Sequence, residues 1–425
     1  MIRAAAFAVL ALAPAVLAPA ARAGTAVPWS VTEFDAPAAE ALAVSPGGRL
    51  LLARAVCGAA GCATAFSTRA PGSPLAEAAT APGRATGSVP QRTGGALVLT
   101  TPLTQRGLVA VDVSATGTVR RSRMLTRRFA RDASAASNGS GASAVIWLTS
   151  RLPQRLQVRT RTRDGAAFGP ARTLARFGRE GGFGGGSVAV GPRGEIAVLW
   201  AAHGALRARV QPPGGPGFGP ALRAGPSDRR AQVAPAFTEG GTLVAAWRSA
   251  DGGAEQSRVA VVRVASLRPG ARRFDRGRRL GEGADAETLA LGRGVGLRAF
   301  AAGRTANVAW TSRSLQVRLA TVHADGAVTA VRVLDPRAVL VDAAGSAAGR
   351  ALVAWTHDPL GQEPAARAML RLTPRRLGPI EPIGPGVARA TGVALDPAAT
   401  RALVTWGAAD PLLSPRWGVA ERPLP

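Results

Sequence analysis

The sequence predicts an all-β protein, a β-propeller of eight four-stranded blades, with seven blades as the alternative. Its 52 glycines and 32 prolines are spread through all 425 residues and leave little room for long helices. A short apolar segment ending in tryptophan also recurs at intervals of 45 to 63 residues, at Trp147, Trp200, Trp247, Trp310, Trp355 and Trp406. Repeats of this length that form four-stranded sheets bury their faces against one another, as propeller blades do.

The segments around each tryptophan repeat as well. In one unit an apolar strand and turn (188–194) precede the tryptophan strand, an alternating strand (206–210) follows it, and a fourth element (218–221) closes the unit. Segments 50–54 and 96–100 hold the same place without a tryptophan, which makes eight units. We expect the six tryptophans to wedge between adjacent blades, where a large aromatic side chain buries the most area.

Residues 1–23 are predicted to be a signal peptide. Arg3 precedes an apolar run (4–20), and Ala21-Arg22-Ala23 places small residues where a signal peptidase reads them. A retained N-terminal anchor is the alternative. Residues 24–425 are then a single propeller domain, secreted or held in the cell envelope, with no membrane span after cleavage. The strand near 28–35 is expected to complete the last blade and to remove an exposed sheet edge.

The only cysteines, Cys57 and Cys62, are expected to form a disulfide, as two cysteines in an exported chain most simply do. A metal site is the weaker interpretation, because two thiols without nearby histidines fall short of a four-ligand zinc site. We therefore predict neither a metal nor a cofactor.

All 53 basic residues are arginine, and the formal net charge is +27. Such a charge attracts anionic partners, including wall polymers, phospholipids and nucleic acid. The runs at 120–128 and 272–279 could bind a polyanion, but few aromatic residues accompany them, so specific nucleic-acid binding is not predicted. The alternative is a solvated surface, since the absence of lysine is typical of a GC-rich genome.

The repeated Ala-Val-Xaa-Trp strands that follow a turn with Pro or Asp and Gly resemble the blade repeats of exported bacterial β-propellers of unassigned function. They are also loosely similar to the Asp-box hairpins of sialidase-like propellers. The Asp-box spacing, Ser-Xaa-Asp-Xaa-Gly-Xaa-Thr-Trp, is two residues shorter than the turns of this chain. A sialidase-type hydrolase also needs a tyrosine nucleophile, and the chain has no tyrosine.

Antiparallel order places the loop after each tryptophan strand on the same face as the loops between blades. That candidate binding face would carry His203, Asp251, Arg313, His357 and Asp358. His357 beside Asp358 could act as a base or a metal ligand, or Asp358-Pro359 could simply form a turn.

No catalytic residue can be assigned. The sequence favours non-catalytic binding or scaffolding, with a glycan, an anionic wall polymer or a protein as the ligand. The alternative is a hydrolase or lyase that acts on glycans or polyanions at this face. The oligomeric state stays open.

Overall fold

The computed structural model describes residues 28–424 except 36–39, 46, 59–60, 103–105, 179–181, 229–230, 251–258, 285–288, 290–294, 347–348, 362, 374–375, 385–387, 397–399 and 409–415. The proposed signal peptide lies outside the described residues. Within them the chain forms strands β1 to β31. None of the described residues belongs to a helix with the length and apolar character that crossing a bilayer requires.

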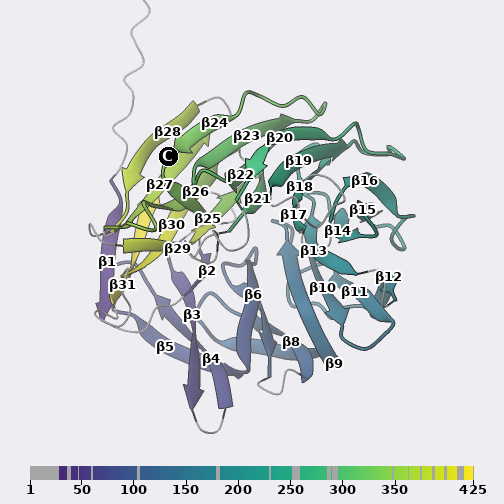
Figure 1. Ribbon diagram of the computed structural model, residues 1–425. Helices are drawn as coiled ribbons and strands as arrows, with labels where there is room; N and C mark the ends of the chain where they lie inside the picture. The colour runs from purple at the N-terminus through teal and green to yellow at the C-terminus, as the bar shows by residue number, and fades with distance from the viewer. Residues whose placement is uncertain are drawn as a thin grey trace, which may run out of the picture.

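The strands form eight antiparallel four-stranded units arranged in a ring (Figure 1), so the predicted all-β propeller is confirmed. Blade 1 consists of β2 (Glu40–Val44), β3 (Leu50–Gly58), β4 (Gly61–Arg69) and β5 (Ala76–Pro82), and blade 2 consists of β6 (Arg84–Pro90), β7 (Ala96–Thr101), β8 (Arg106–Val113) and β9 (Val119–Ser137). Blade 3 uses β9 again, with β10 (Ser143–Thr149), β11 (Gln154–Arg161) and β12 (Arg172–Phe177). Blade 4 consists of β13 (Phe183–Val190), β14 (Ile196–Ala202), β15 (Ala205–Gln211) and β16 (Leu222–Pro226). Blade 5 consists of β17 (Gln232–Phe237), β18 (Leu243–Ala250), β19 (Ala260–Leu267) and β20 (Arg278–Gly283), and blade 6 consists of β21 (Leu297–Ala302), β22 (Thr305–Thr311), β23 (Val317–His323) and β24 (Arg332–Asp335). Blade 7 consists of β25 (Ala338–Gly345), β26 (Ala351–His357), β27 (Ala365–Thr373) and β28 (Arg376–Pro382). Blade 8 consists of β29 (Ala388–Leu395), β30 (Arg401–Ala408) and β31 (Arg416–Pro423) together with β1 (Ser30–Asp35).

Blades 2 and 3 share one long strand. The first part of β9 pairs with β8 and its last part pairs with β10, so the two blades form a single seven-stranded sheet. Asp132, with a φ of 51°, lies where the register of the β9–β10 ladder shifts. Strand β9 therefore passes directly from the outside of blade 2 to the inside of blade 3.

The ring returns to its start at the two ends of the chain. Strand β1 pairs with β31 from Ser30 opposite Glu421 to Asp35 opposite Arg416, and the two strands lie side by side in Figure 1. The guanidinium of Arg422 stacks over the Trp29 ring at 5.4 Å. Each innermost strand contacts the innermost strand of the next blade, and β2 contacts β29. The first and last blades are therefore neighbours.

All six repeat tryptophans lie on the second strand of a blade and are at most 2% exposed. Each one packs against the preceding blade: Trp247 of blade 5, for example, shares a core cluster with Leu199 and Leu206 of blade 4. Its indole N–H donates to the Pro226 carbonyl of β16 at 2.8 Å, and Trp310 donates in the same way to the Glu282 carbonyl of β20 at 3.1 Å. The indoles therefore fill the space between blades, and those of Trp247 and Trp310 also hydrogen-bond across it.

The two interfaces without a repeat tryptophan receive an aromatic side chain from the other side. Between blades 8 and 1 it is Trp417 of β31, and between blades 1 and 2 it is Phe66 of β4, both on third strands and both buried. Every interface around the ring thus holds at least one large aromatic side chain.

At three of these interfaces, an arginine near the end of a third strand also contacts a polar side chain of the preceding blade. Arg161 reaches Asp112 of blade 2 at 2.8 Å, and Arg371 reaches Asn307 of blade 6 at 2.9 Å. Arg69 lies 3.8 Å from Glu421 of blade 8. Burial lowers the pKa of the Arg371 guanidinium.

Candidate functional site

Two sets of loops divide the molecule into two faces. The 2–3 face, defined by the loops between second and third strands, also carries the connections between blades. Hydrogen bonds join the two kinds of loop directly, from Ser227 N to the Gly204 carbonyl at 3.1 Å and from Ala338 N to the Leu315 carbonyl at 2.6 Å. The 1–2 face, defined by the turns between first and second strands, lies at the opposite end of the strands.

The structure does not bring the predicted binding-face residues together. His203 (φ 50°) lies in the β14–β15 turn of blade 4, and Arg313 lies in the β22–β23 turn of blade 6. His357 ends β26 of blade 7 and Asp358 follows it. Asp251 lies outside the described residues. The four described residues are on the 2–3 face but belong to three different blades, so they do not form one site.

His357 has a different partner from the neighbour proposed for it. Its Nδ1 lies 2.9 Å from both carboxylate oxygens of Asp335, on β24 of blade 6. Asp335 is 1% exposed and also accepts from Trp355 Nε1 at 2.8 Å and from Arg367 at 3.3 Å. Asp358 (φ 45°) instead makes backbone turn contacts, from its N–H to the Arg337 carbonyl and from Gly361 N to its own carbonyl.

The Asp335 carboxylate thus fixes the imidazole of His357 while it joins blade 6 to blade 7. An imidazole oriented in this way could accept a proton. The Asp335 carboxylate, however, already contacts three side chains of blade 7, those of Trp355, His357 and Arg367. Among the described residues, no three His, Cys, Asp or Glu side chains cluster as metal ligands.

The most distinctive feature of the 2–3 face is a basin of about 490 Å³ on blades 2 and 3, which we call the arginine basin. Its lining is Arg106, Arg127, Arg128, Phe129, Thr149, Ser150, Arg151, Leu152, Pro153 and Arg155. The volume falls within the range of small-molecule sites in proteins, which is roughly 300–1,000 Å³.

Strand pairing brings this lining together from three parts of the chain. Arg106 at the start of β8 is paired with Phe129 of β9, next to Arg127 and Arg128. The N–H of Ser150 donates to the Phe129 carbonyl at 3.3 Å and so attaches the β10–β11 loop, which carries Arg151. The long strand β9, passing from one blade to the other, therefore places its arginines between the loops of both.

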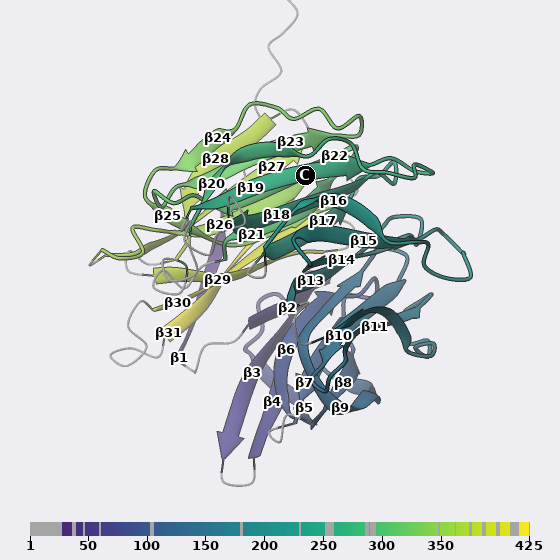
Figure 2. The same cartoon turned by 45° about the vertical axis from the view of Figure 1, so that its right-hand side comes forward.

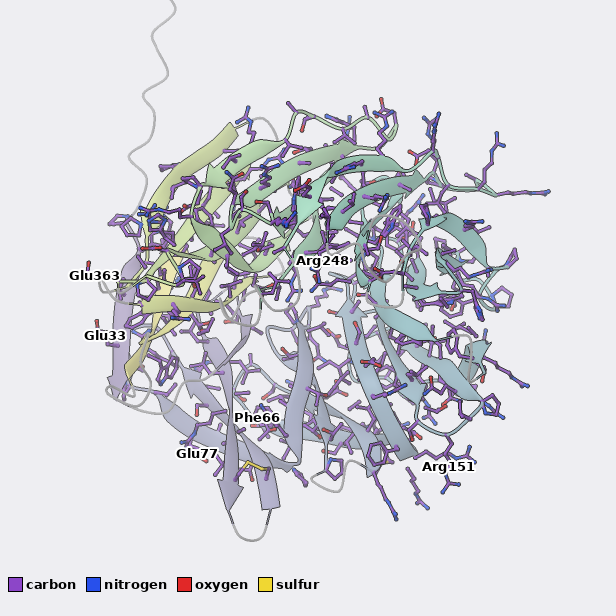
Figure 3. All side chains as sticks on the ribbon, viewed as in Figure 1. Glu33, Phe66, Glu77, Arg151, Arg248 and Glu363 are labelled. Atoms are coloured by element: carbon purple, nitrogen blue, oxygen red, sulfur yellow. A yellow bond between two sulfur atoms is a disulfide. The ribbon has the colours of Figure 1, made fainter. Side chains whose placement is uncertain are left out.

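The arginine basin is strongly electropositive. It has five arginines and no Asp or Glu in its lining, and within the described part of the chain none of these arginines forms an ion pair. Other arginines do have carboxylate partners, such as Arg54 with Glu77 at 3.0 Å and Arg298 with Asp342 at 2.9 Å. Figure 3 shows Arg151 at the outer edge of these blades, directed away from the ribbon. Uncompensated guanidinium groups around a concave surface attract anions.

The centre of the ring holds a second cavity, of about 420 Å³, at the 1–2 face. First-strand ends and turns of seven blades line it, and its acidic residues are Glu239, Asp342 and Asp396. Two of these carboxylates are engaged: Asp342 pairs with Arg298, and Asp396 accepts from Thr400 Oγ1 at 3.0 Å. The central cavity therefore lies on the face opposite the predicted binding residues.

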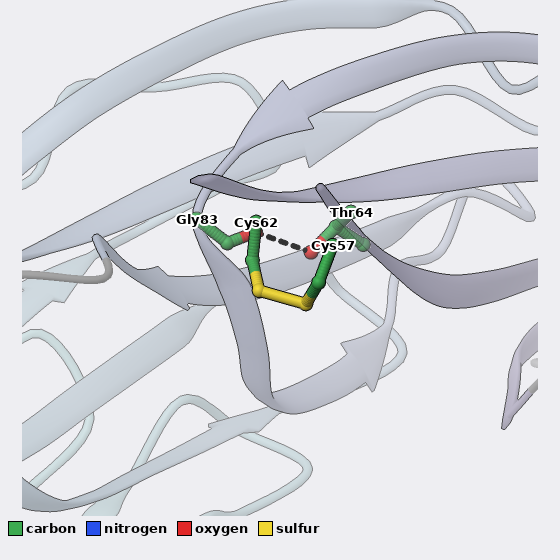
Figure 4. The surroundings of a disulfide bond; sticks show 4 residues. All are labelled: Cys57, Cys62, Thr64 and Gly83. Atoms are coloured by element: carbon green, nitrogen blue, oxygen red, sulfur yellow. Dashed lines mark hydrogen bonds between the residues drawn. A yellow bond between two sulfur atoms is a disulfide. The ribbon is translucent and has the colours of Figure 1, made fainter. Parts of the chain in front are cut away.

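The disulfide between Cys57 and Cys62 is present (Figure 4). It spans the end of the β3–β4 ladder, which projects from the ring in Figures 1 and 2. Beside it, Thr64 Oγ1 donates to the Gly83 carbonyl at 2.8 Å. The bond therefore holds the two strands together near the tip of an extended hairpin.

Comparison with solved structures supports the fold class. A lectin, BP39L from Burkholderia pseudomallei, is similar with a TM-score of 0.53 and 13% identity over 83% of this chain and 100% of its own. The propeller of Dos1 is similar with a TM-score of 0.53 and 6% identity over 93% of this chain and 94% of its own. No family model and no curated protein matches the sequence. The chain is thus a β-propeller, and at these identities the likeness is one of fold alone.

Proposed function

We propose that this protein is an extracytoplasmic, non-catalytic binding propeller that holds an anionic ligand in the arginine basin. The observation that carries the proposal is the set of five arginines that line one concavity with no acidic residue among them. A guanidinium group binds carboxylate, sulfate and phosphate oxygens through paired N–H donors, so this lining suits a polyanion better than a neutral sugar.

Two further observations support parts of this proposal. The Cys57–Cys62 disulfide is typical of proteins that fold outside the cytoplasm. His357 and Asp335 belong to blades 7 and 6, whereas the arginine basin belongs to blades 2 and 3. Two blades separate the two places on each side of the ring, blades 8 and 1 on one side and blades 4 and 5 on the other, so the oriented imidazole does not serve the basin.

The test is salt-dependent retention on immobilised heparin, a sulfated polyanion. We expect the purified protein to be retained at low salt and released as salt rises, because counterions screen exposed charges. The variant Arg127→Glu/Arg128→Glu/Arg151→Glu should elute at clearly lower salt. A matched control, Arg304→Glu/Arg332→Glu/Arg337→Glu, makes the same charge change at exposed positions outside the basin and outside both arginine runs. Equal elution of the two variants would show that net charge, and not the basin, is responsible.

One observation favours a second candidate, a hydrolase or lyase acting on glycans or polyanions. It is the contact of 2.9 Å between His357 Nδ1 and Asp335, which orients an imidazole on the 2–3 face. In that case the wild type would cleave heparin or another anionic oligosaccharide, and His357→Gln would abolish the cleavage. Chromatography of the oligosaccharide after incubation distinguishes the two, since a binding protein leaves its chain length unchanged.

A further inference from the structure

The arginine basin is bordered by exposed apolar side chains as well as by charge. Met124 is 47% exposed, Phe129 38% and Leu152 51%, and they are among the eight large hydrophobic side chains most exposed in the described residues. Phe129 and Leu152 are part of the basin lining. The Met124 side chain lies against Gly107, the residue that follows Arg106. The three apolar side chains therefore lie in or beside the arginine basin.

A dissolved polyanion would contact the arginines but would leave these apolar groups in water. A bilayer surface accommodates both, because anionic headgroups meet the cations while Phe, Leu and Met side chains enter the boundary between headgroups and acyl chains. Each arginine close to an anionic leaflet strengthens binding by roughly fivefold. Arg151 and Leu152 are adjacent in the exposed β10–β11 loop, so they can reach a flat surface together.

We infer that the arginine basin docks the propeller on anionic phospholipid bilayers, with a headgroup phosphate among the arginines and with Phe129 and Leu152 in the interface. This inference rests on the proposed function, since it names the partner of the same site. The chemistry recognised is a phosphate ester beside apolar chains. A free phosphate ester offers only the first of these features, and the two sources can therefore be separated.

The test is co-sedimentation of the purified protein with vesicles. The protein should bind vesicles of equimolar phosphatidylglycerol and phosphatidylcholine at least 100-fold more tightly than vesicles of phosphatidylcholine alone. Phe129→Ser/Leu152→Ser should weaken binding to the anionic vesicles at least tenfold. The control Val333→Ser/Leu360→Ser removes apolar side chains of similar exposure from blades 6 and 7 and should bind as the wild type does. Far-UV circular dichroism and the unfolding midpoint establish that each variant is folded.

The outcomes separate this inference from the proposed function. If Phe129→Ser/Leu152→Ser binds anionic vesicles as the wild type does, the apolar groups have no part and the bilayer inference is overturned. If the protein binds heparin but neither kind of vesicle, the bilayer inference is wrong and the proposed function stands. If it binds neither heparin nor vesicles, both are wrong.

Discussion

The packing of Trp247 over Gly225 gives a sharp test of the blade interfaces. Gly225 lies on β16 of blade 4, and a Cβ at that position would lie 2.6 Å from Cζ2 and 3.0 Å from Cη2 of the Trp247 indole. The indole cannot easily move away, because it is fully buried and its N–H donates to the Pro226 carbonyl at 2.8 Å. We expect Gly225→Ala to lower the free energy of unfolding by about 1–3 kcal/mol, the usual cost of overpacking a filled core.

Trp247→Phe should remove the clash, because phenylalanine lacks the two atoms that the new methyl group meets. On its own this change costs about 1 kcal/mol for the lost hydrogen bond. It costs about 2 kcal/mol more for the ring atoms no longer buried, at about 0.8 kcal/mol for each carbon-sized group. In the double variant the methyl group introduced by Gly225→Ala occupies part of the vacated space. The double variant should therefore be more stable than the two single losses predict, by about 1–2 kcal/mol, as expected for residues in direct contact.

Urea unfolding followed by far-UV circular dichroism measures all four proteins, and equal m-values show that the comparison is valid. Gly219→Ala in the same blade is the control, because its Cβ would meet only the Val210 carbonyl, at an ordinary 3.5 Å. That control should change stability by less than about 0.5 kcal/mol. Strict additivity of Gly225→Ala and Trp247→Phe would mean that the indole does not fill the space between blades 4 and 5.

Three further predictions concern other contacts. Arg161→Ala should lower stability in urea by about 3–5 kcal/mol, because it leaves the buried Asp112 carboxylate without its guanidinium partner; a loss below about 1 kcal/mol would contradict this. Burial raises the pKa of Asp164, so its stabilising contribution is present at low pH and is lost as pH rises from the ordinary carboxyl pKa through the raised value. Asp164→Asn should therefore gain stability over the wild type across that acidic window, and unfolding measured at several pH values checks the sign. Cys57→Ser/Cys62→Ser should cost about 2 kcal/mol, the chain-entropy value for so short a loop, and thermal unfolding would show a far larger loss if the hairpin supported the whole ring.

The fold could be predicted from the sequence because each blade of a propeller repeats the same pattern of apolar strands and turns. The recurrence of tryptophan strands and the turns before them was enough for an all-β ring. It did not reveal that blades 2 and 3 share a strand. The sequence did contain a signal for the shared strand, namely a lack of turn-forming residues. Strand β9 (Val119–Ser137) contains neither glycine nor proline over its whole length. Nor could it assign aromatic side chains to the two interfaces without a repeat tryptophan, because Trp417 and Phe66 enter them from the opposite blade.

The candidate site could be predicted only in part. Arg127 and Arg128 stand out as a run, but Arg106, Arg151 and Arg155 join them only through strand pairing and a loop contact. The partner of His357 was equally hidden, because Asp335 lies in the neighbouring blade and has no sequence feature that links it to His357. Contacts between blades depend on the exact register of several strands, which a repeat of variable length does not specify.

The position of the basin on strands bears on how it binds. Arg106, Arg127, Arg128 and Arg155 lie on β8, β9 and β11, and only Arg151 lies in a loop. Arg106 and Arg155 are paired in β ladders, and the Arg128 N–H donates to Thr126 Oγ1 at 3.1 Å. These backbone positions are held before any ligand arrives, so binding has mainly to order side chains. Like charges held close together without carboxylates repel one another, and an anion relieves that repulsion. Binding of the anion should therefore also stabilise the fold, by an amount that rises with the logarithm of ligand concentration above Kd. Heparin should raise the unfolding midpoint of the wild type and leave that of the Arg127→Glu/Arg128→Glu/Arg151→Glu variant nearly unchanged.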